Sequence, residues 1–121
     1  MHTFILQDYA TIRGTTGTAI TQNESGWLDL TPYQDLVFWI DTRELTATVT
    51  CRLQTSPTKD EAMFLDIITS FALAVTVTQK PALLGTATVP IARYLRWVLI
   101  GSATPWDATL RIYVAANSPG M

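Results

Sequence analysis

The clearest alternation of apolar and polar residues in the chain is TATVTCRLQT, residues 46–55. Val49, Cys51 and Leu53 occupy every second position, and threonine, arginine and glutamine stand between and around them. Successive side chains of a β-strand point to opposite faces, so this spacing predicts a strand with one face in a hydrophobic core.

Three further segments outside this stretch show the same period of two. Residues 35–42 carry apolar side chains on both faces, which favours a central strand, and residues 94–100 and 108–114 alternate more simply. Residues 64–71 form a short apolar run whose periodicity does not separate strand from helix. We favour a strand there, with a single helical turn at residues 61–63.

Shorter candidate strands lie at residues 4–8, 27–30 and 73–78, and the last two end at the proline-containing pairs Thr31-Pro32 and Lys80-Pro81. About eight closely spaced strands without a long amphipathic helix predict an all-β fold. The expected architecture is an antiparallel β-sandwich, jelly-roll-like, of about eight strands.

The domain organisation follows from the length of 121 residues, which is close to the usual size of one domain. We expect residues 1–121 to form a single β-sandwich domain. Residues 1–20 are expected as an arm or an edge strand, and residues 115–121 as a flexible tail. The single cysteine excludes an intrachain disulfide.

The charge composition limits the partners. Only 15% of the residues are charged, against about 25% in ordinary soluble domains, and the net charge is −2. No cluster of lysine and arginine is present, so we expect neither a nucleic-acid partner nor a membrane partner. The opening residues MHTFILQD lack the basic and apolar regions of a signal peptide, so synthesis in the cytoplasm is expected.

The uncharged polar residues are chiefly threonine, of which there are 20. Threonine is β-branched and suits a pleated surface. A threonine-rich surface with few charges is typical of a protein covered by neighbours, and equally of a sandwich whose threonines face solvent.

The side chains that usually carry catalysis are few and poorly placed. His2 is the only histidine and lies at the terminus, and Cys51 lies in the middle of a strand, where a core position is the simplest interpretation. Asp60, Glu61 and Asp66 are close in sequence, but nothing marks two of them as an acid–base pair. We therefore expect a binding or assembly protein, not an enzyme, with no cofactor and no metal.

The four tryptophans divide into two groups. Trp39 and Trp97 lie inside strong strands, so core packing is their default interpretation. Trp27 and Trp106 lie where loops meet strands. There an indole can stack on a sugar, anchor a protein neighbour or, in the interpretation that we favour, close the open end of the sandwich.

Two arginine–tyrosine pairs offer a candidate interface. Arg96 shares a strand face with Tyr94, and Arg111 shares one with Tyr113. If the two strands were neighbours, these side chains would form a polar-aromatic strip of the kind enriched in interface cores. The candidate interface or ligand contacts are Trp27, Trp106, Tyr94, Arg96, Arg111 and Tyr113.

Five short motifs carry a resemblance to a known family: Gly26-Trp27-Leu28-Asp29-Leu30, Leu36-Val37-Phe38-Trp39-Ile40-Asp41, Leu53-Gln54-Thr55-Ser56-Pro57, Asp60-Glu61-Ala62-Met63-Phe64 and Arg93-Tyr94-Leu95-Arg96-Trp97. In this order they resemble small β-sandwich auxiliary or minor capsid (decoration) proteins of tailed bacteriophages. The resemblance implies a structural virion component that binds and stabilises the capsid lattice. It further implies the major capsid protein and other virion proteins as partners, a homo-oligomer such as a trimer, and localisation in the virion.

The last of these motifs also looks like the late strand of galactose-binding-like jelly rolls. That second resemblance implies an alternative function, a carbohydrate-binding jelly-roll module or a tail-associated adhesin. Neither resemblance implies a catalytic residue.

Overall fold

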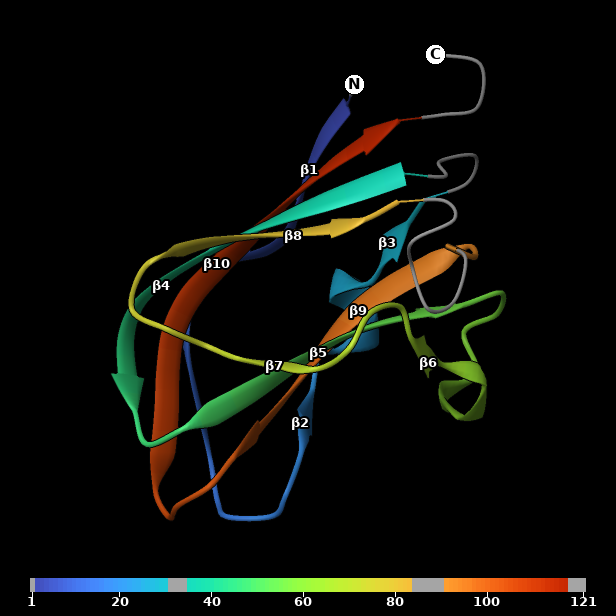
Figure 1. Cartoon of the computed structure of the whole chain (residues 1–121). Helices are drawn as coiled ribbons and strands as arrows, with labels where there is room; N and C mark the ends of the chain where they lie inside the picture. Colours follow the sequence, from blue (N-terminus) through green and yellow to red (C-terminus); the bar gives the residue numbers. More distant parts are fainter. Residues whose placement is uncertain (1, 31–34, 84–90, 118–121) are drawn as a thin grey trace.

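A computed structural model describes residues 2–30, 35–83 and 91–117 as two antiparallel β-sheets packed into a sandwich (Figure 1). The four-stranded sheet has the order β1-β10-β4-β8. Its strands are β1 (His2–Gly14), β10 (Trp106–Asn117), β4 (Asp35–Thr46) and β8 (Val77–Ala82). The predicted all-β sandwich is confirmed.

The second sheet has six strands in the described residues, built on β9 (Tyr94–Gly101) and β5 (Val49–Ser56). Four two-residue strands flank this pair: β2 (Ile20–Thr21), β3 (Leu28–Asp29), β6 (Leu65–Asp66) and β7 (Phe71–Ala72). Both β2 and β3 pair with β9, whereas β6 and β7 pair with β5. If β2 and β3 are counted as one interrupted strand, and β6 and β7 as another, the sandwich has the expected eight strands in a jelly-roll order.

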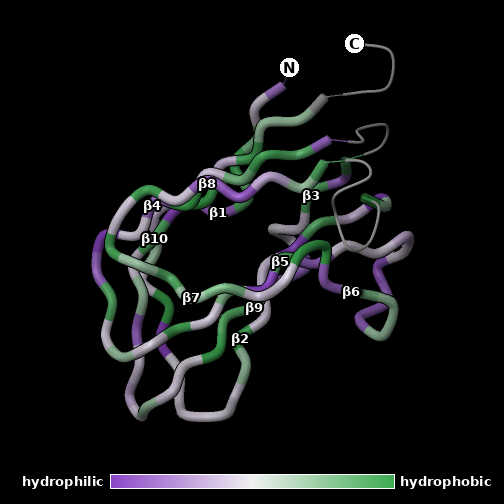
Figure 2. Tube along the Cα trace, viewed as in Figure 1, coloured by the Kyte–Doolittle hydropathy of each residue, from purple (hydrophilic) through white to green (hydrophobic). Residues whose placement is uncertain are grey.

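The core fills the space between the sheets, and Figure 2 shows hydrophobic residues along β4, β5 and β9 beside a paler loop between β1 and β2. Every second residue of the long strands points inward. The predicted faces are confirmed, because the following residues are all buried: Leu36, Phe38 and Ile40 of β4, Val49, Cys51 and Leu53 of β5, Leu95, Trp97 and Leu99 of β9, and Leu110, Ile112 and Val114 of β10. The predicted central position of β4 is confirmed too, since it lies between β10 and β8.

Cys51 behaves as the small core residue that its position predicts. It is completely buried, and burial raises the pKa of its thiol to about 12. The thiol is therefore protonated at neutral pH and unreactive.

Trp106 closes one end of the sandwich and is fully buried. Its indole Nε1 donates to the carbonyl of Thr15 at 3.1 Å. Gly14 and Gly101 lie directly against the ring, and a Cβ at either position would overlap with indole atoms. This burial agrees with the favoured interpretation of Trp106 as a plug, and its ring is not available to a ligand.

β1 is longer than the strand predicted at residues 4–8 and forms one edge of the four-stranded sheet. Its pairing with β10 shifts between Ile5 and Gln7 and again between Gln7 and Ala10. These bulges interrupt the alternation in the sequence, and they explain why only part of the strand was predicted.

The strand predicted at residues 73–78 begins only at Val77, and the break predicted at Lys80-Pro81 is wrong, because β8 runs through both residues. β8 is an edge strand, where a proline can stand without breaking the sheet. The corner predicted at Thr31-Pro32 lies outside the described residues.

The segment after β5 is mostly irregular. A single 3-10 turn at Glu61–Met63 matches the predicted helical turn, but residues 64–71 contribute only β6 and the first residue of β7 to the sheet. At the other end of the chain, residues 115–117 belong to β10, so this part of the predicted tail is strand. Residues 118–121 lie outside the described residues.

Candidate interaction surface

The outward side of the four-stranded sheet exposes a group of large apolar side chains, which we call the sheet face and define by Ile5, Tyr9, Trp39, Val77 and Tyr113. Four of the five are strongly exposed: Ile5 by 51%, Tyr9 by 43%, Trp39 by 44% and Val77 by 56%. Single exposed apolar residues are ordinary, but a contiguous group is typical of an interaction site.

The register places these side chains in rows across the sheet. Ile5 of β1 pairs with Tyr113 of β10, Tyr113 pairs with Trp39 of β4, and Trp39 pairs with Gln79 of β8. Directly paired residues of antiparallel strands share one face and lie close together. The sheet face is therefore continuous from one edge of the sheet to the other.

A charged centre lies next to this row. Asp41 is only 7% exposed, and its Oδ2 accepts a hydrogen bond of 2.6 Å from the hydroxyl of Tyr9. Arg43 Nε lies 2.9 Å from Asp41 Oδ1, and Arg111 Nε lies 3.1 Å from Oδ2. Both guanidinium groups also contact the ring of Tyr9, at 6.0 and 4.6 Å from its centroid.

These contacts fix the charge of the centre. The hydrogen bond from Tyr9, together with Arg43 and Arg111, holds the pKa of Asp41 below its ordinary value, although desolvation opposes them. The carboxylate is thus ionised at neutral pH. Two arginines face this one carboxylate, so the group of Tyr9, Asp41, Arg43 and Arg111 carries one net positive charge. Exposed Glu44, which pairs with Thr109, stands next on the same face.

Trp39 was predicted to pack in the core, and this prediction is wrong. The residue lies on the outward side of β4, in the same row as exposed Gln79 of the edge strand. A signal was present in the sequence, since Asp41 falls on the same strand face two positions later. An aspartate beside an indole on one strand face indicates a surface position.

The predicted arginine–tyrosine strip does not form, because β9 and β10 belong to different sheets. Arg111 and Tyr113 do lie together on the outer side of the four-stranded sheet, with Arg111 Nη1 donating to the Tyr113 hydroxyl at 3.4 Å. Arg96 and Tyr94 lie in the other sheet.

Arg96 is buried, with an exposed fraction of 7%. Its guanidinium carbon lies 3.9 Å from the ring centroid of Phe64 and 5.3 Å from that of Trp27, and these two rings meet edge to face at 4.8 Å. Its Nε donates a hydrogen bond to Gln54 Oε1 at 2.9 Å. Its Nη1 makes no hydrogen bond and forms only a long ion pair with Glu61 Oε1, at 3.7 Å. Burial lowers the pKa of Arg96. The position of Arg96 is that of a packing residue.

Tyr94 and Trp27 are both partly buried. Lys59 and Arg93 lie over the ring of Tyr94, at 5.6 and 5.0 Å from its centroid. Trp27 donates its indole N–H to the carbonyl of Gln22 at 2.8 Å. Of the six predicted contacts, the structure brings only Arg111 and Tyr113 to an exposed aromatic surface.

A second exposed group lies on the segment after β5 and at the start of β6, in the layer opposite β4 and β8, as the green coil beside β6 in Figure 1. We call it the acidic tip and define it by Asp60, Glu61, Met63 and Leu65. Met63 is 49% exposed and Leu65 is 58% exposed, and the side chain of Glu61 is 76% exposed. Asp60 fixes the turn by accepting a 3.0 Å hydrogen bond from the amide of Ala62.

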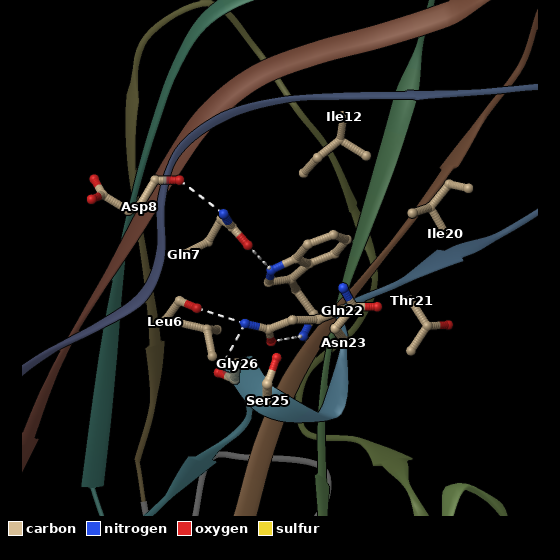
Figure 3. A pocket seen from close by; sticks show the side chains of 11 residues that line it. Leu6, Gln7, Asp8, Ile12, Ile20, Thr21, Gln22, Asn23, Ser25 and Gly26 are labelled. Carbon is tan, nitrogen blue, oxygen red and sulfur yellow. Dashed lines mark hydrogen bonds between the residues drawn. The ribbon is translucent and has the colours of Figure 1, made fainter.

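A pocket of about 440 Å³ lies where β1 and β2 part at one side of the sandwich (Figure 3). Its polar groups are largely engaged with one another. Gln22 Nε2 donates to the carbonyl of Leu6 at 2.6 Å, and Gln7 Oε1 accepts from Trp97 Nε1 at 3.0 Å. These bonds hold bulged β1 against the second sheet, so we interpret the pocket as a structural seam.

The described part of the chain contains no cluster of histidine, cysteine, aspartate or glutamate suited to a metal ion. It also contains no helix of the length and apolar character required to cross a membrane.

Comparison with known proteins shows a fold and no family. No protein-family model and no curated protein sequence matches the chain. Among solved structures, 98% of the chain aligns with a chain from the structure of the infectious bursal disease virus Gx strain, at a TM-score of 0.54 and 11% identity. The alignment spans 33% of that viral chain. At 11% identity, the two chains are shown to share a β-sandwich fold and nothing more.

Proposed function

We propose that this protein is a structural component of a virus particle and acts by binding, without catalysis. More specifically, we propose an auxiliary, decoration or minor capsid protein of a tailed phage or phage-like particle, which stabilises the capsid lattice. The observation that carries the proposal is the sheet face, where exposed Ile5 and Trp39 flank half-buried Tyr113 in one continuous row.

The chemistry of the sheet face suits a protein partner. Aromatic residues and arginine are enriched in the buried centres of interfaces, where a few of them supply most of the binding free energy. Burying apolar surface contributes about 25 cal/mol per Å². The charged centre at Asp41 is held by Tyr9, Arg43 and Arg111 before any partner arrives, which lowers the entropy cost of binding.

The proposed location is the virion, and the proposed partners are the major capsid protein and further copies of this chain. Two independent features support this. One is the fold shared with a chain of a virus structure, and the other is the set of motifs that resemble phage decoration proteins.

The alternative of a carbohydrate-binding module or adhesin depended on Trp27 and Trp106. Trp106 is fully buried, and Trp27 is covered by Phe64 and Arg96. No specific observation now favours that alternative over the particle component.

Mass spectrometry of purified particles, with copies counted per particle, tests the proposed function. A lattice-binding protein should be present at a fixed, high copy number. Particles made with Trp39→Ala should lose the protein, whereas Thr18→Ala, a change at an exposed residue of the loop between β1 and β2, should leave the copy number unchanged. Absence of the unaltered protein from particles would overturn the proposal, and scarce copies confined to the tail would favour the adhesin.

A further inference from the structure

We propose that the sheet face of one copy binds the acidic tip of a second copy. The contact is heterologous, meaning that two different surfaces meet, and it rests on the use of the sheet face in the proposed function. It adds which surface of a second copy meets the sheet face.

The sheet face offers a positive centre with apolar surroundings. The side chain of Arg43 is 62% exposed and that of Arg111 is 34% exposed, and the two share the single carboxylate of Asp41. A guanidinium has five N–H donors, so both groups retain donors toward solvent. Trp39 and Val77 flank this centre as exposed apolar contacts.

The acidic tip carries the carboxylates of Asp60 and Glu61 beside two exposed apolar side chains. Within its own copy, Glu61 makes only a long contact of 3.7 Å with buried Arg96. The neighbouring cation Lys59 packs over the ring of Tyr94. Met63 and Leu65 stand beside Glu61, so a carboxylate and two exposed apolar side chains are presented together.

Charge selects face-to-tip contact over the two symmetric contacts. Two sheet faces meeting each other would oppose positive centres, and two acidic tips would oppose carboxylates, each at a cost in binding free energy. Only the contact of face with tip joins opposite charges while burying apolar residues of both surfaces.

The placement of the two surfaces determines what such a contact builds. The sheet face lies on the four-stranded sheet, and the acidic tip lies on the other layer. A copy bound through its sheet face therefore keeps its tip free for a third copy. A heterologous contact of this kind closes into a ring when the rotation permits, and otherwise extends as a chain.

Engineered cysteines test the contact without interference, because Cys51 is buried and its pKa is raised to about 12. Gln79→Cys marks the sheet face and Met63→Cys marks the acidic tip. Under a mild oxidant, a mixture of the two single variants should give disulfide-linked dimers, and neither variant alone should do so. Thr18→Cys, at an exposed residue of the loop between β1 and β2, is the matched control and should not link to either. Self-linking of Gln79→Cys, or no linked dimer in the mixture, overturns the inference.

Charge reversal supplies a second test. Arg43→Glu and Glu61→Arg should each weaken self-association about tenfold or more, measured by analytical ultracentrifugation, and the double variant should regain most of it. Arg93→Glu, at a side chain that is 54% exposed and paired with Asp29, should have no effect. If Glu61→Arg lowers the melting temperature, Leu65→Asn replaces it. Additive losses in the double variant would contradict a direct contact.

The two proposals fail separately. Particles that carry the protein, together with a mixture that does not cross-link, would overturn the self-contact and leave the particle role intact. If the face and the tip cross-link efficiently but the protein is absent from particles, the particle role is overturned and the self-contact stands.

Discussion

The two outer sides of the sandwich differ in how their aromatic residues are covered. On the four-stranded sheet, Trp39 and Tyr9 stand exposed around a charged centre. On the second sheet, Trp27 and Phe64 close over Arg96, and they stand directly before β3 and β6 respectively. Long connections can cover a sheet, and among residues 2–30, 35–83 and 91–117 none provides such cover for Trp39 and Val77 on the outward side of β4 and β8. The comparison shows that strand periodicity decides which side chains point outward, whereas connections decide which of them meet solvent.

Removing the cover of the second sheet should have the largest effect on stability. Phe64 is 7% exposed and contacts both Trp27 and Arg96, so Phe64→Ala should cost about 3 kcal/mol of unfolding free energy. Urea denaturation measures the change. Met63→Ala, at the exposed neighbouring position, is the control and should change stability by under about 0.5 kcal/mol. A loss from Phe64→Ala no larger than the control would show that the cover is not packed as described.

Replacing the buried guanidinium of Arg96 should have the second largest effect on stability. Arg96→Ala removes the group between two rings and leaves Gln54 Oε1 without its donor, so we expect a loss of about 2 kcal/mol. Arg96→Met keeps most of the packing and should recover part of that loss. If the methionine variant were as unstable as the alanine variant, the charge and not the packing would hold this side together.

The charged centre of the sheet face should show its contribution through pH. The pKa of Asp41 in the folded protein lies below its ordinary value of 3.8, so its stabilising contribution is complete above that value and is lost as pH falls through the folded pKa. Asp41→Asn should therefore lower stability at pH 7. The difference in stability between the variant and the unaltered protein should become smaller below about pH 3.8. Melting temperatures of both proteins, recorded from pH 7 to below pH 3.8, measure this difference. A gap independent of pH would contradict an ionised Asp41.

The smallest effect on the isolated protein is expected from Trp39→Ala. Because 44% of this residue is exposed, the change should alter unfolding free energy by less than about 1 kcal/mol. The same variant should nonetheless be lost from particles. Large destabilisation by Trp39→Ala would mean that the indole serves the fold instead of a partner.

The inward faces of the long strands could be predicted from sequence because burial repeats every second residue. The pairing of strands could not, since it depends on contacts distant in the chain. Arg96 and Arg111 show this directly: both follow the same local pattern beside a tyrosine, but one lies in each sheet. The 44% exposure of Trp39 also depends on how the connections in the described part of the chain run, which local periodicity does not report.

The edges of the four-stranded sheet limit how copies of this protein can associate. β1 carries two bulges, and β8, the opposite edge, carries Lys80 and Pro81. Bulges, lysine and proline on edge strands discourage backbone pairing between sheets of different molecules. A protein crowded on a particle surface would otherwise be at risk of fibre formation through such pairing. With both edges of this sheet obstructed, association through it must use side chains, and shape and charge then decide which neighbours it accepts.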